Sequence, residues 1–130
     1  MPLPALSLRV ALWVAAGGAL GSTARWAIAE LLRRPPGPPT FPWATFSVNL
    51  TGALALGWLF GWAVDASIAP EHRAFLLVGV LGGFTTFSAF AFETLALMQN
   101  GQYGKAALYV VASVALSVGA AALGFGLARA

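Results

Sequence analysis

The sequence lacks cysteine and has few charged residues. Without cysteine, disulfide, thiolate and cysteine–metal chemistry are excluded. Charged residues make up 8% of the chain and hydrophobic residues 59%, whereas soluble domains carry about 25% charged residues. A soluble protein with so few charges would have little with which to cover its surface. The composition therefore predicts one integral membrane domain that spans residues 1–130.

Groups for acid–base chemistry are scarce as well. The chain has one histidine and four acidic residues, and no nucleophile–base–orienter set is apparent in the sequence. We therefore expect a protein that is not an enzyme. The net charge of +3 comes from scattered basic residues that flank apolar runs, as topology determinants do. Nucleic acid is not an expected partner.

Four long apolar segments fit membrane helices, which need about 20 mostly apolar residues. The expected spans are residues 6–32, 42–64, 73–100 and 103–127. Between them lie the sequences RRPPGPPTFP (33–42), DASIAPEHR (65–73) and QNGQYG (99–104). Proline and glycine interrupt helices, so these connections are expected to be short loops. The pattern predicts an all-α integral membrane protein with four transmembrane helices.

The basic residues are nearly balanced between the two ends of such a bundle. With four spans, one side holds Arg9, Arg73 and Arg129. The other side holds Arg25, Arg33, Arg34 and Lys105. Orientation in a membrane depends on an excess of basic residues on one side, so a chain with little excess can insert both ways. This balance suggests an antiparallel homodimer. Arg25 can instead be buried against protein, which would change the count of basic residues on its side.

Small residues recur at four-residue spacing, which lets membrane helices approach each other closely. The pairs are Gly17/Gly21, Gly57/Gly61, Gly79/Gly83 and Ser113/Ser117. We expect most of them to pack helices within one chain. Because four thin helices can barely enclose a polar path, we also expect the chain to associate into an oligomer.

Polar side chains share faces on two of the expected spans. Thr45 and Asn49 lie four residues apart. An asparagine at membrane depth is costly and usually functional, although it can also simply bond a neighbouring helix. Tyr109, Ser113 and Ser117 form one hydroxyl stripe over two turns. Serines can instead bond back to their own helix, but three aligned hydroxyls suggest a neutral polar track.

The third span contains the sequence GGFTTFSAFAFET (82–94). The pair Gly82–Gly83 weakens a helix, and Thr85–Thr86 can bond to the backbone. Local unwinding would free carbonyls, which is tolerated in a membrane only where the break is buried or lines a cavity. Freed carbonyls can coordinate a monovalent cation. The stretch predicts a helix that is broken in mid-membrane.

Two phenylalanines share a face just after the expected break. Phe87 and Phe90 would normally contact lipid or fill a core, but their positive ring edges can also favour an anion. Glu93 follows on or beside that face, where it would be near an interface, solvated or bonded to a neighbouring helix. An interior of hydroxyls, one amide and ring edges, almost without charge, favours passage of a small anion.

Several stretches resemble the Fluc (CrcB) family of bacterial fluoride channels, along essentially the whole chain. They are GGALGSTARW (17–26), PWATFSVNLTGALALG (42–57), GVLGGFTTFSAFAFET (79–94) and the Tyr109/Ser113/Ser117 stripe. The resemblance implies a dual-topology homodimer of four-helix subunits with two antiparallel pores. It places the protein in the bacterial plasma (inner) membrane, as a multi-pass channel. It also implies passive, electrodiffusive export of toxic cytoplasmic fluoride.

The same resemblance implies roles for individual residues. A fluoride pore would be lined by Asn49, Phe87, Phe90, Thr45, Ser88, Tyr109, Ser113 and Ser117. Arg25 would anchor an end of the dimer or attract anions at a vestibule. A structural Na⁺ at the dimer centre would be held by the main-chain carbonyls of Gly82 and Thr85.

Two other classes compete with this interpretation. A small multidrug-resistance transporter is also a four-helix, dual-topology dimer, but proton-coupled cation export needs an acid in mid-membrane, typically in the first span. The first span offers Glu30, which lies near its end. A structural subunit of a larger membrane complex would explain the packing glycines. It would not explain the set of asparagine, phenylalanines and hydroxyls.

Overall fold

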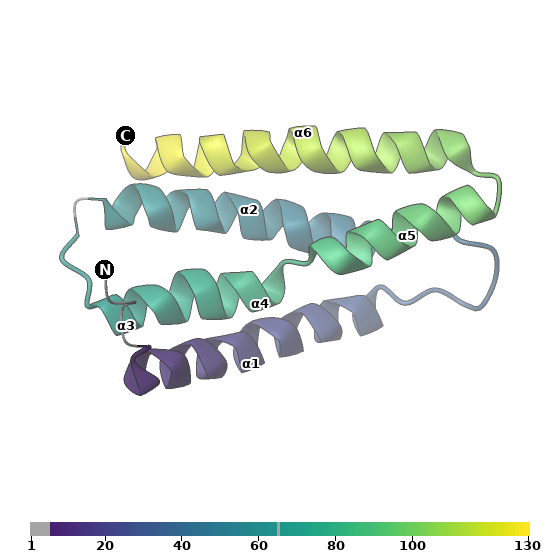
Figure 1. Ribbon diagram of the computed structural model, residues 1–130. Coiled ribbons are helices and arrows are strands. Elements are labelled where there is room, and N and C mark those ends of the chain that lie inside the picture. Colours follow the sequence, from purple (N-terminus) through teal and green to yellow (C-terminus); the bar gives the residue numbers. More distant parts are fainter. Residues whose placement is uncertain (1–5, 65) are drawn as a thin grey trace, which may run out of the picture.

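The computed structural model describes residues 6–64 and 66–130, and every regular element in these residues is a helix. The elements lie side by side in a bundle (Figure 1). In chain order they are α1 (Leu8–Leu31), α2 (Trp43–Ala63), α3 (Pro70–Arg73), the wide helical segment η1 (Ala74–Leu81), α4 (Gly82–Phe84), α5 (Phe87–Gln99) and α6 (Tyr103–Ala128). The segments α3, η1, α4 and α5 together form the third stretch of the bundle. The beginning of α1 and the end of α6 lie at the same end of the bundle.

Three of the stretches are long and apolar enough to cross a membrane. They are Trp43–Ala63, Pro70–Gln99 and Tyr103–Ala128. The remaining long helix, α1, has 24 residues and runs alongside them (Figure 1), but it is less hydrophobic than α2 or α6. The all-α prediction is confirmed for the described residues, and α1 as a fourth span stays a prediction.

The helix ends follow the punctuation of the sequence. Residues 32–42 contain no helix, as their prolines predict. The third stretch begins at Pro70, about one turn earlier than expected, because proline suits the first helical position, where its missing N–H is not needed. Gly101 has a positive φ of 71° in the turn before α6. Residue 65, in the expected second connection, lies outside the described residues.

Glycines join the helices into two close, parallel pairs. A β-carbon at Gly17 or Gly21 on α1 would overlap backbone atoms of η1 or α4. In the other pair, a β-carbon at Gly57 on α2 would overlap the Ala121 carbonyl of α6, and one at Gly124 would overlap the Leu54 carbonyl of α2. The prediction that the glycine pairs pack helices within one chain is therefore confirmed. Contacts between the two pairs are much fewer.

The third stretch changes its neighbours at residues 85–86. Before that point η1 and α4 pack mainly on α1, and after it α5 packs mainly on α6. Figure 1 shows α5 crossing from the middle of the bundle toward α6. A straight helix would stay with one neighbour, so the break brings Phe90 and Glu93 against the α2/α6 pair.

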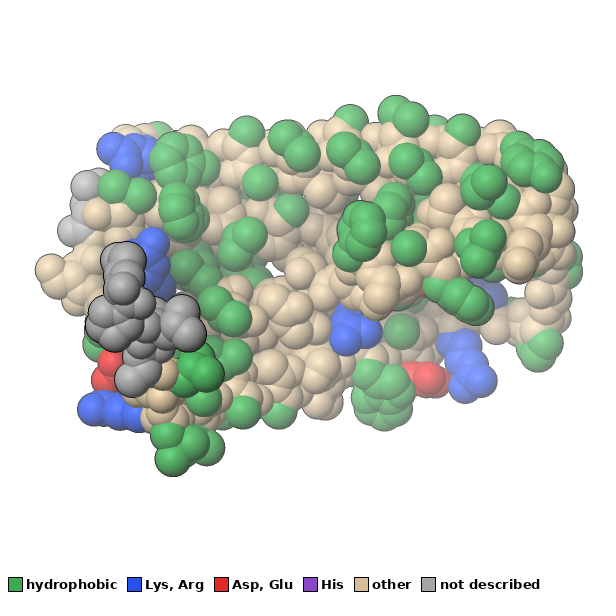
Figure 2. Space-filling view, in the orientation of Figure 1, with side chains coloured by type: hydrophobic (Ala, Val, Ile, Leu, Met, Phe, Trp, Pro, Cys, Tyr) green, Lys and Arg blue, Asp and Glu red, His purple; other side chains and the backbone are tan. Residues whose placement is uncertain are grey.

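The outer surface suits a lipid environment. Figure 2 shows hydrophobic side chains spread along one face and most charged side chains near its two ends. Trp43 and Trp62, both about half exposed, lie near opposite ends of α2. Their separation of 19 residues in the sequence corresponds to a rise of about 28 Å in an α-helix, close to the roughly 30 Å of a bilayer core. Tryptophan is typical of both edges of that core.

Candidate functional site

The break in the third stretch consists of two extended residues. Thr85 has φ −80° and ψ 156°, and Thr86 has φ −149° and ψ 126°. The predicted interruption is confirmed, but the glycine pair itself stays helical, as part of α4. Gly83 is needed for close packing instead, because a β-carbon there would lie 2.8 Å from the Gly18 carbonyl oxygen of α1. The chain changes direction at Thr85 and Thr86.

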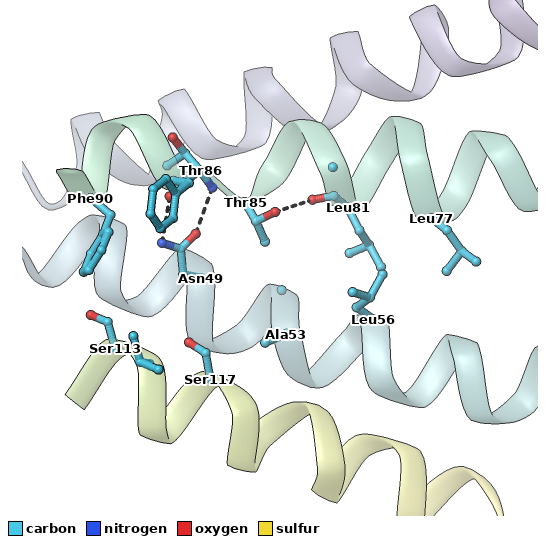
Figure 3. Close-up of a pocket in the computed structure, with 14 residues that line it drawn as sticks. Asn49, Ala53, Leu56, Leu77, Leu81, Thr85, Thr86, Phe90, Ser113 and Ser117 are labelled. Atoms are coloured by element: carbon cyan, nitrogen blue, oxygen red, sulfur yellow. Dashed lines mark hydrogen bonds between the residues drawn. The ribbon is translucent and has the colours of Figure 1, made fainter. Parts of the chain in front are cut away.

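Asn49 replaces the helical hydrogen bonds that the break removes. Its Oδ1 accepts from the Thr86 N–H at 2.8 Å, and its Nδ2 donates to the Thr86 carbonyl at 2.9 Å (Figure 3). One side-chain amide thus pairs with both polar groups of one peptide residue. In a membrane interior an unpaired peptide group is costly, so Asn49 braces the break in addition to facing the groove described below. Bonding of Asn49 to a neighbouring segment is confirmed, and its role in a pore stays a prediction.

Arg25 and Thr85 bond other carbonyls near the break. The Nε–H of Arg25 on α1 donates to the Gly83 carbonyl at 3.1 Å. The Thr85 hydroxyl donates to the Leu81 carbonyl at 2.9 Å (Figure 3). Arg25 is therefore held against protein at the middle of the third stretch, the possibility that the charge balance had left open. The predicted role in a vestibule or as an anchor of the dimer stays a prediction.

A groove of about 360 Å³ lies between the third stretch and the α2/α6 pair. Its polar lining consists of Asn49, Thr85, Thr86, Ser113 and Ser117. The remaining lining consists of Phe87, Phe90, Gly52, Ala53, Leu56, Leu77, Leu81, Gly82 and Val114. All of these side chains are uncharged, so the groove offers hydroxyls, an amide and ring edges without a fixed charge.

The serines of α6 supply free donors to this groove. Figure 3 shows Ser113 and Ser117 pointing from α6 toward Phe90 and Asn49. Ser113 is 8% exposed, and its hydroxyl has no hydrogen-bond partner. Buried hydroxyls are normally paired, and a serine in a helix can bond its own backbone, as Ser22 does with the Gly18 carbonyl. The Ser113 hydroxyl therefore has its hydrogen-bonding capacity available for a partner at the groove.

Tyr109, the third member of the stripe, lies next to the groove and not on its wall. Its ring is fully buried, and its hydroxyl donates to Glu93 at 2.7 Å. Thr45 donates to the other oxygen of the same carboxylate, also at 2.7 Å. Of the alternatives for Glu93, the structure shows bonding to neighbouring helices. The predicted pore roles of Thr45 and Tyr109 stay predictions, since neither side chain lines the groove in the single chain.

The two phenylalanines after the break lie on the groove wall. Their ring centroids are 5.5 Å apart at an interplanar angle of 47°. Phe87 is 79% exposed, whereas Phe90 packs against Tyr109 at 5.1 Å. Ser88 is exposed and shares a hydrogen bond with the Thr86 hydroxyl. A side chain as exposed as Phe87 is available for contact with a second chain or a ligand.

The backbone at the break fits the predicted sodium site. The Thr86 N–H bonds Asn49 instead of the Gly82 carbonyl four residues earlier, so that carbonyl loses its helical partner. Gly82 is exposed, and a β-carbon there would find little nearby. Thr85 is extended, which turns its carbonyl out of the helix. Freed carbonyl oxygens are ligands that Na⁺ takes at broken membrane helices. Sodium binding itself stays a prediction.

Comparison with known proteins agrees with the resemblance seen in the motifs. The family model described as "CrcB-like protein, Camphor Resistance (CrcB)" matches residues 12–125. The chain belongs to the CrcB family. Its relatives include the fluoride-specific ion channel FluC of Rhodospirillum centenum, 48% identical over 94% of this chain and 97% of the relative. A FluC protein of Thermus thermophilus is 46% identical over 89% of this chain and 92% of the relative.

The groove is the candidate functional site of this CrcB-family chain. Several features of the groove were not predicted from the sequence. The Thr86 hydroxyl accepts from the Ala89 N–H, as expected of a threonine that bonds the backbone, but the pairing of the Thr86 peptide group with Asn49 was not predicted. The apolar half of the groove, formed by Leu56, Leu77 and Leu81, was not predicted either. Leucines on a membrane helix carry no signal that separates a groove wall from a lipid-facing surface.

Proposed function

We propose that this chain is the subunit of a fluoride-selective channel that lets toxic fluoride leave the cytoplasm by passive electrodiffusion. Its CrcB-family relatives are named fluoride-specific ion channels. Hydrogen fluoride crosses lipid as a weak acid and dissociates inside the cell. The trapped anion then needs a route out, and a channel suffices because the membrane potential drives anions outward.

The unpaired Ser113 hydroxyl in an uncharged groove is the observation that carries this proposal. Stripping an ion of water unaided costs on the order of tens of kcal/mol by a Born estimate. Ser113 and Ser117 can each donate one hydrogen bond, and Asn49 has a second amide hydrogen beyond the one given to Thr86. The edges of Phe87 and Phe90 add partial positive charge. A narrow path with these donors favours the smallest halide over chloride.

The dimer of the proposal is antiparallel, in the bacterial plasma (inner) membrane. The Nε–H of Arg25 bonds the Gly83 carbonyl within the bundle, so Arg25 does not belong to a loop. Each end then holds three basic residues: Arg9, Arg73 and Arg129 at one end and Arg33, Arg34 and Lys105 at the other. An even balance supports insertion in both orientations. A two-fold axis in the membrane plane would then create two equivalent pores of opposite direction.

The second chain would complete each pore, because the groove is open along one side and Phe87 projects from it. A structural Na⁺ at the centre of the dimer would be held by the carbonyls of Gly82 and Thr85. Bound there, it would supply positive charge near the pores without a lysine or arginine. Thr86 and Asn49 hold the break open for such a site through their paired hydrogen bonds.

A small multidrug-resistance-type transporter is the alternative, and three observations speak against it. The lining of the groove contains no acidic side chain. Glu30 is exposed and pairs with Arg33 at 3.2 Å near the end of α1. Glu93 is bonded by two hydroxyls. A proton-coupled cation exporter needs an acid that its substrate can reach, and neither residue lines the groove.

The deciding experiment is anion efflux from liposomes that contain the purified protein. We expect rapid fluoride efflux, little chloride efflux and no dependence on a proton gradient. Ser113→Ala should lower the fluoride rate at least about tenfold, because one lost hydrogen bond to a charged group is worth roughly 1.5–3 kcal/mol. Ser22→Ala is the matched control, since Ser22 bonds its own helix away from the groove. Equal efflux rates of chloride and fluoride, or no efflux of either anion, would refute the proposal.

A further inference from the structure

A row of aromatic rings connects the proline-rich loop to the groove. Phe41, which lies in the loop between α1 and α2, meets Tyr109 with its ring centroid at 5.4 Å and an interplanar angle of 77°. Tyr109 in turn meets Phe90 at 5.1 Å, and Phe90 meets Phe87 at 5.5 Å. The first ring belongs to a loop and the last two belong to the groove wall.

The loop that carries Phe41 is held in place from outside the α1/α2 connection. The side chain of Gln102, just before α6, donates from Nε2 to the Pro39 carbonyl at 2.7 Å. The Phe41 carbonyl accepts from the Trp43 N–H at 2.9 Å. The ring of Phe41 also packs against Phe46 at 5.5 Å in an edge-on geometry. Pro42 restricts the backbone directly after Phe41, so Phe41 is fixed on several sides.

Tyr109 transmits the position of Phe41 to Phe90. Its ring is fully buried, and its hydroxyl is bonded to Glu93, which fixes one end of the side chain. Phe41 and Phe90 both pack against the cluster formed by Leu97, Ala106 and Tyr109. Interiors of this kind are close-packed, so a ring removed on one side leaves space into which its neighbours relax.

Phe90 needs such support because it lies just after the break. The α5 helix that carries it does not continue the hydrogen bonding of α4, so the α1 contacts that hold η1 and α4 do not hold α5 directly. We propose that Phe41 is a positioning residue for the groove, and that the Gln102–Pro39 hydrogen bond clamps it against Tyr109 so that Phe90 keeps the ring orientation that selects the ion. This inference rests on the proposed function as far as ion selection is concerned.

Transport tests the inference with two variants and two backgrounds. Phe41→Ala removes the supporting ring. Gln102→Leu removes the Gln102–Pro39 hydrogen bond without removing any aromatic side chain. Each should lower the ratio of fluoride to chloride efflux by roughly 2- to 12-fold, which is the interaction free energy of one aromatic pair expressed as a ratio of rates. In a Phe90→Ile background neither variant should lower the ratio further. Pro36→Ala, in the same loop and exposed, is the control and should leave the ratio unchanged.

A second readout does not depend on transport. A single 4-fluorophenylalanine at position 90 gives a ¹⁹F NMR signal that reports the surroundings of that ring. We expect Phe41→Ala and Gln102→Leu to shift or broaden this signal and Pro36→Ala to leave it unchanged. An unchanged signal, or a ratio that falls equally in both backgrounds, would overturn the inference. Should wild-type protein fail to conduct fluoride, the proposed function is refuted, and the NMR signal alone decides whether Phe41 positions Phe90.

Discussion

Replacing Asn49 with leucine tests whether this residue braces the broken helix. The substitution keeps a similar volume but removes the acceptor for the Thr86 N–H and the donor for the Thr86 carbonyl. A buried polar group left unpaired costs about 1–3 kcal/mol, while hydrogen bonds between membrane helices average about 0.6 kcal/mol. Asn49 and Thr86 are partly buried. We therefore expect Asn49→Leu to lower the free energy of unfolding by about 1–3 kcal/mol.

The assay is unfolding of the purified protein in detergent, with Asn49→Asp as an intermediate variant. Aspartate keeps an acceptor for the Thr86 N–H but turns an oxygen toward the Thr86 carbonyl, so it loses one of the two bonds. In liposomes its negative charge should also abolish fluoride conduction, because no lysine or arginine lines the groove to compensate it. Thr51→Val is the control, since the Thr51 hydroxyl bonds the Ser47 carbonyl of its own helix.

If the Asn49→Leu variant is as stable as the wild type, the bracing role is refuted and Asn49 only lines the groove. Wild-type fluoride rates of Asn49→Asp would exclude Asn49 from the conduction path. Because one variant reports mainly on stability and the other mainly on charge, the two roles of this side chain are separable.

Three further predictions concern the glycines, the phenylalanines and the cation. Gly21→Ala should destabilise the fold by about 1–3 kcal/mol through overpacking, because its β-carbon would overlap the Val80 carbonyl. Gly18→Ala is the control. A β-carbon there meets nothing within 4 Å, so this variant should be neutral in the same unfolding assay. Phe90→Ile should cut fluoride efflux while the elution of the protein, as the proposed dimer, stays unchanged in size-exclusion chromatography; an unchanged efflux rate would remove the ring-edge role. Replacement of Na⁺ by a much larger cation should lower fluoride efflux or dimer stability, and equal values in both salts would show that the Gly82 and Thr85 carbonyls hold no structural sodium.

The positions of the helices along the chain could be predicted from the sequence, because prolines, glycines and apolar runs determine where helices form and end. Prolines in residues 32–42 exclude a helix, and apolar runs of sufficient length predict the spans. Gly17 and Gly21 lie four residues apart, which predicts a close helix contact, although spacing does not name the partner helix. The structure supplies the partners, η1 and α4.

The details of the groove could not be predicted in the same way, because they depend on which faces meet. The stripe of Tyr109, Ser113 and Ser117 is regular along α6, but only the serines reach the groove. The tyrosine meets Glu93 because the break turns α5 toward α6. The position of the break itself depended on competition between the glycines and the threonines. Tertiary contacts from Gly18 and Asn49 decided it, and these contacts are remote in the sequence.

The arrangement of the helices in two parallel pairs has a consequence for biosynthesis. Each tight contact joins segments that are not consecutive, Gly17 with Gly79 and Gly57 with Ala121, and the two pairings interleave along the chain. During cotranslational insertion α1 has no glycine-lined partner until the third stretch leaves the ribosome, and α2 must wait for α6. Such separated contacts slow folding. A truncated chain that ends after the second or third stretch would therefore expose unmatched glycine faces, which we expect quality-control proteases to recognise.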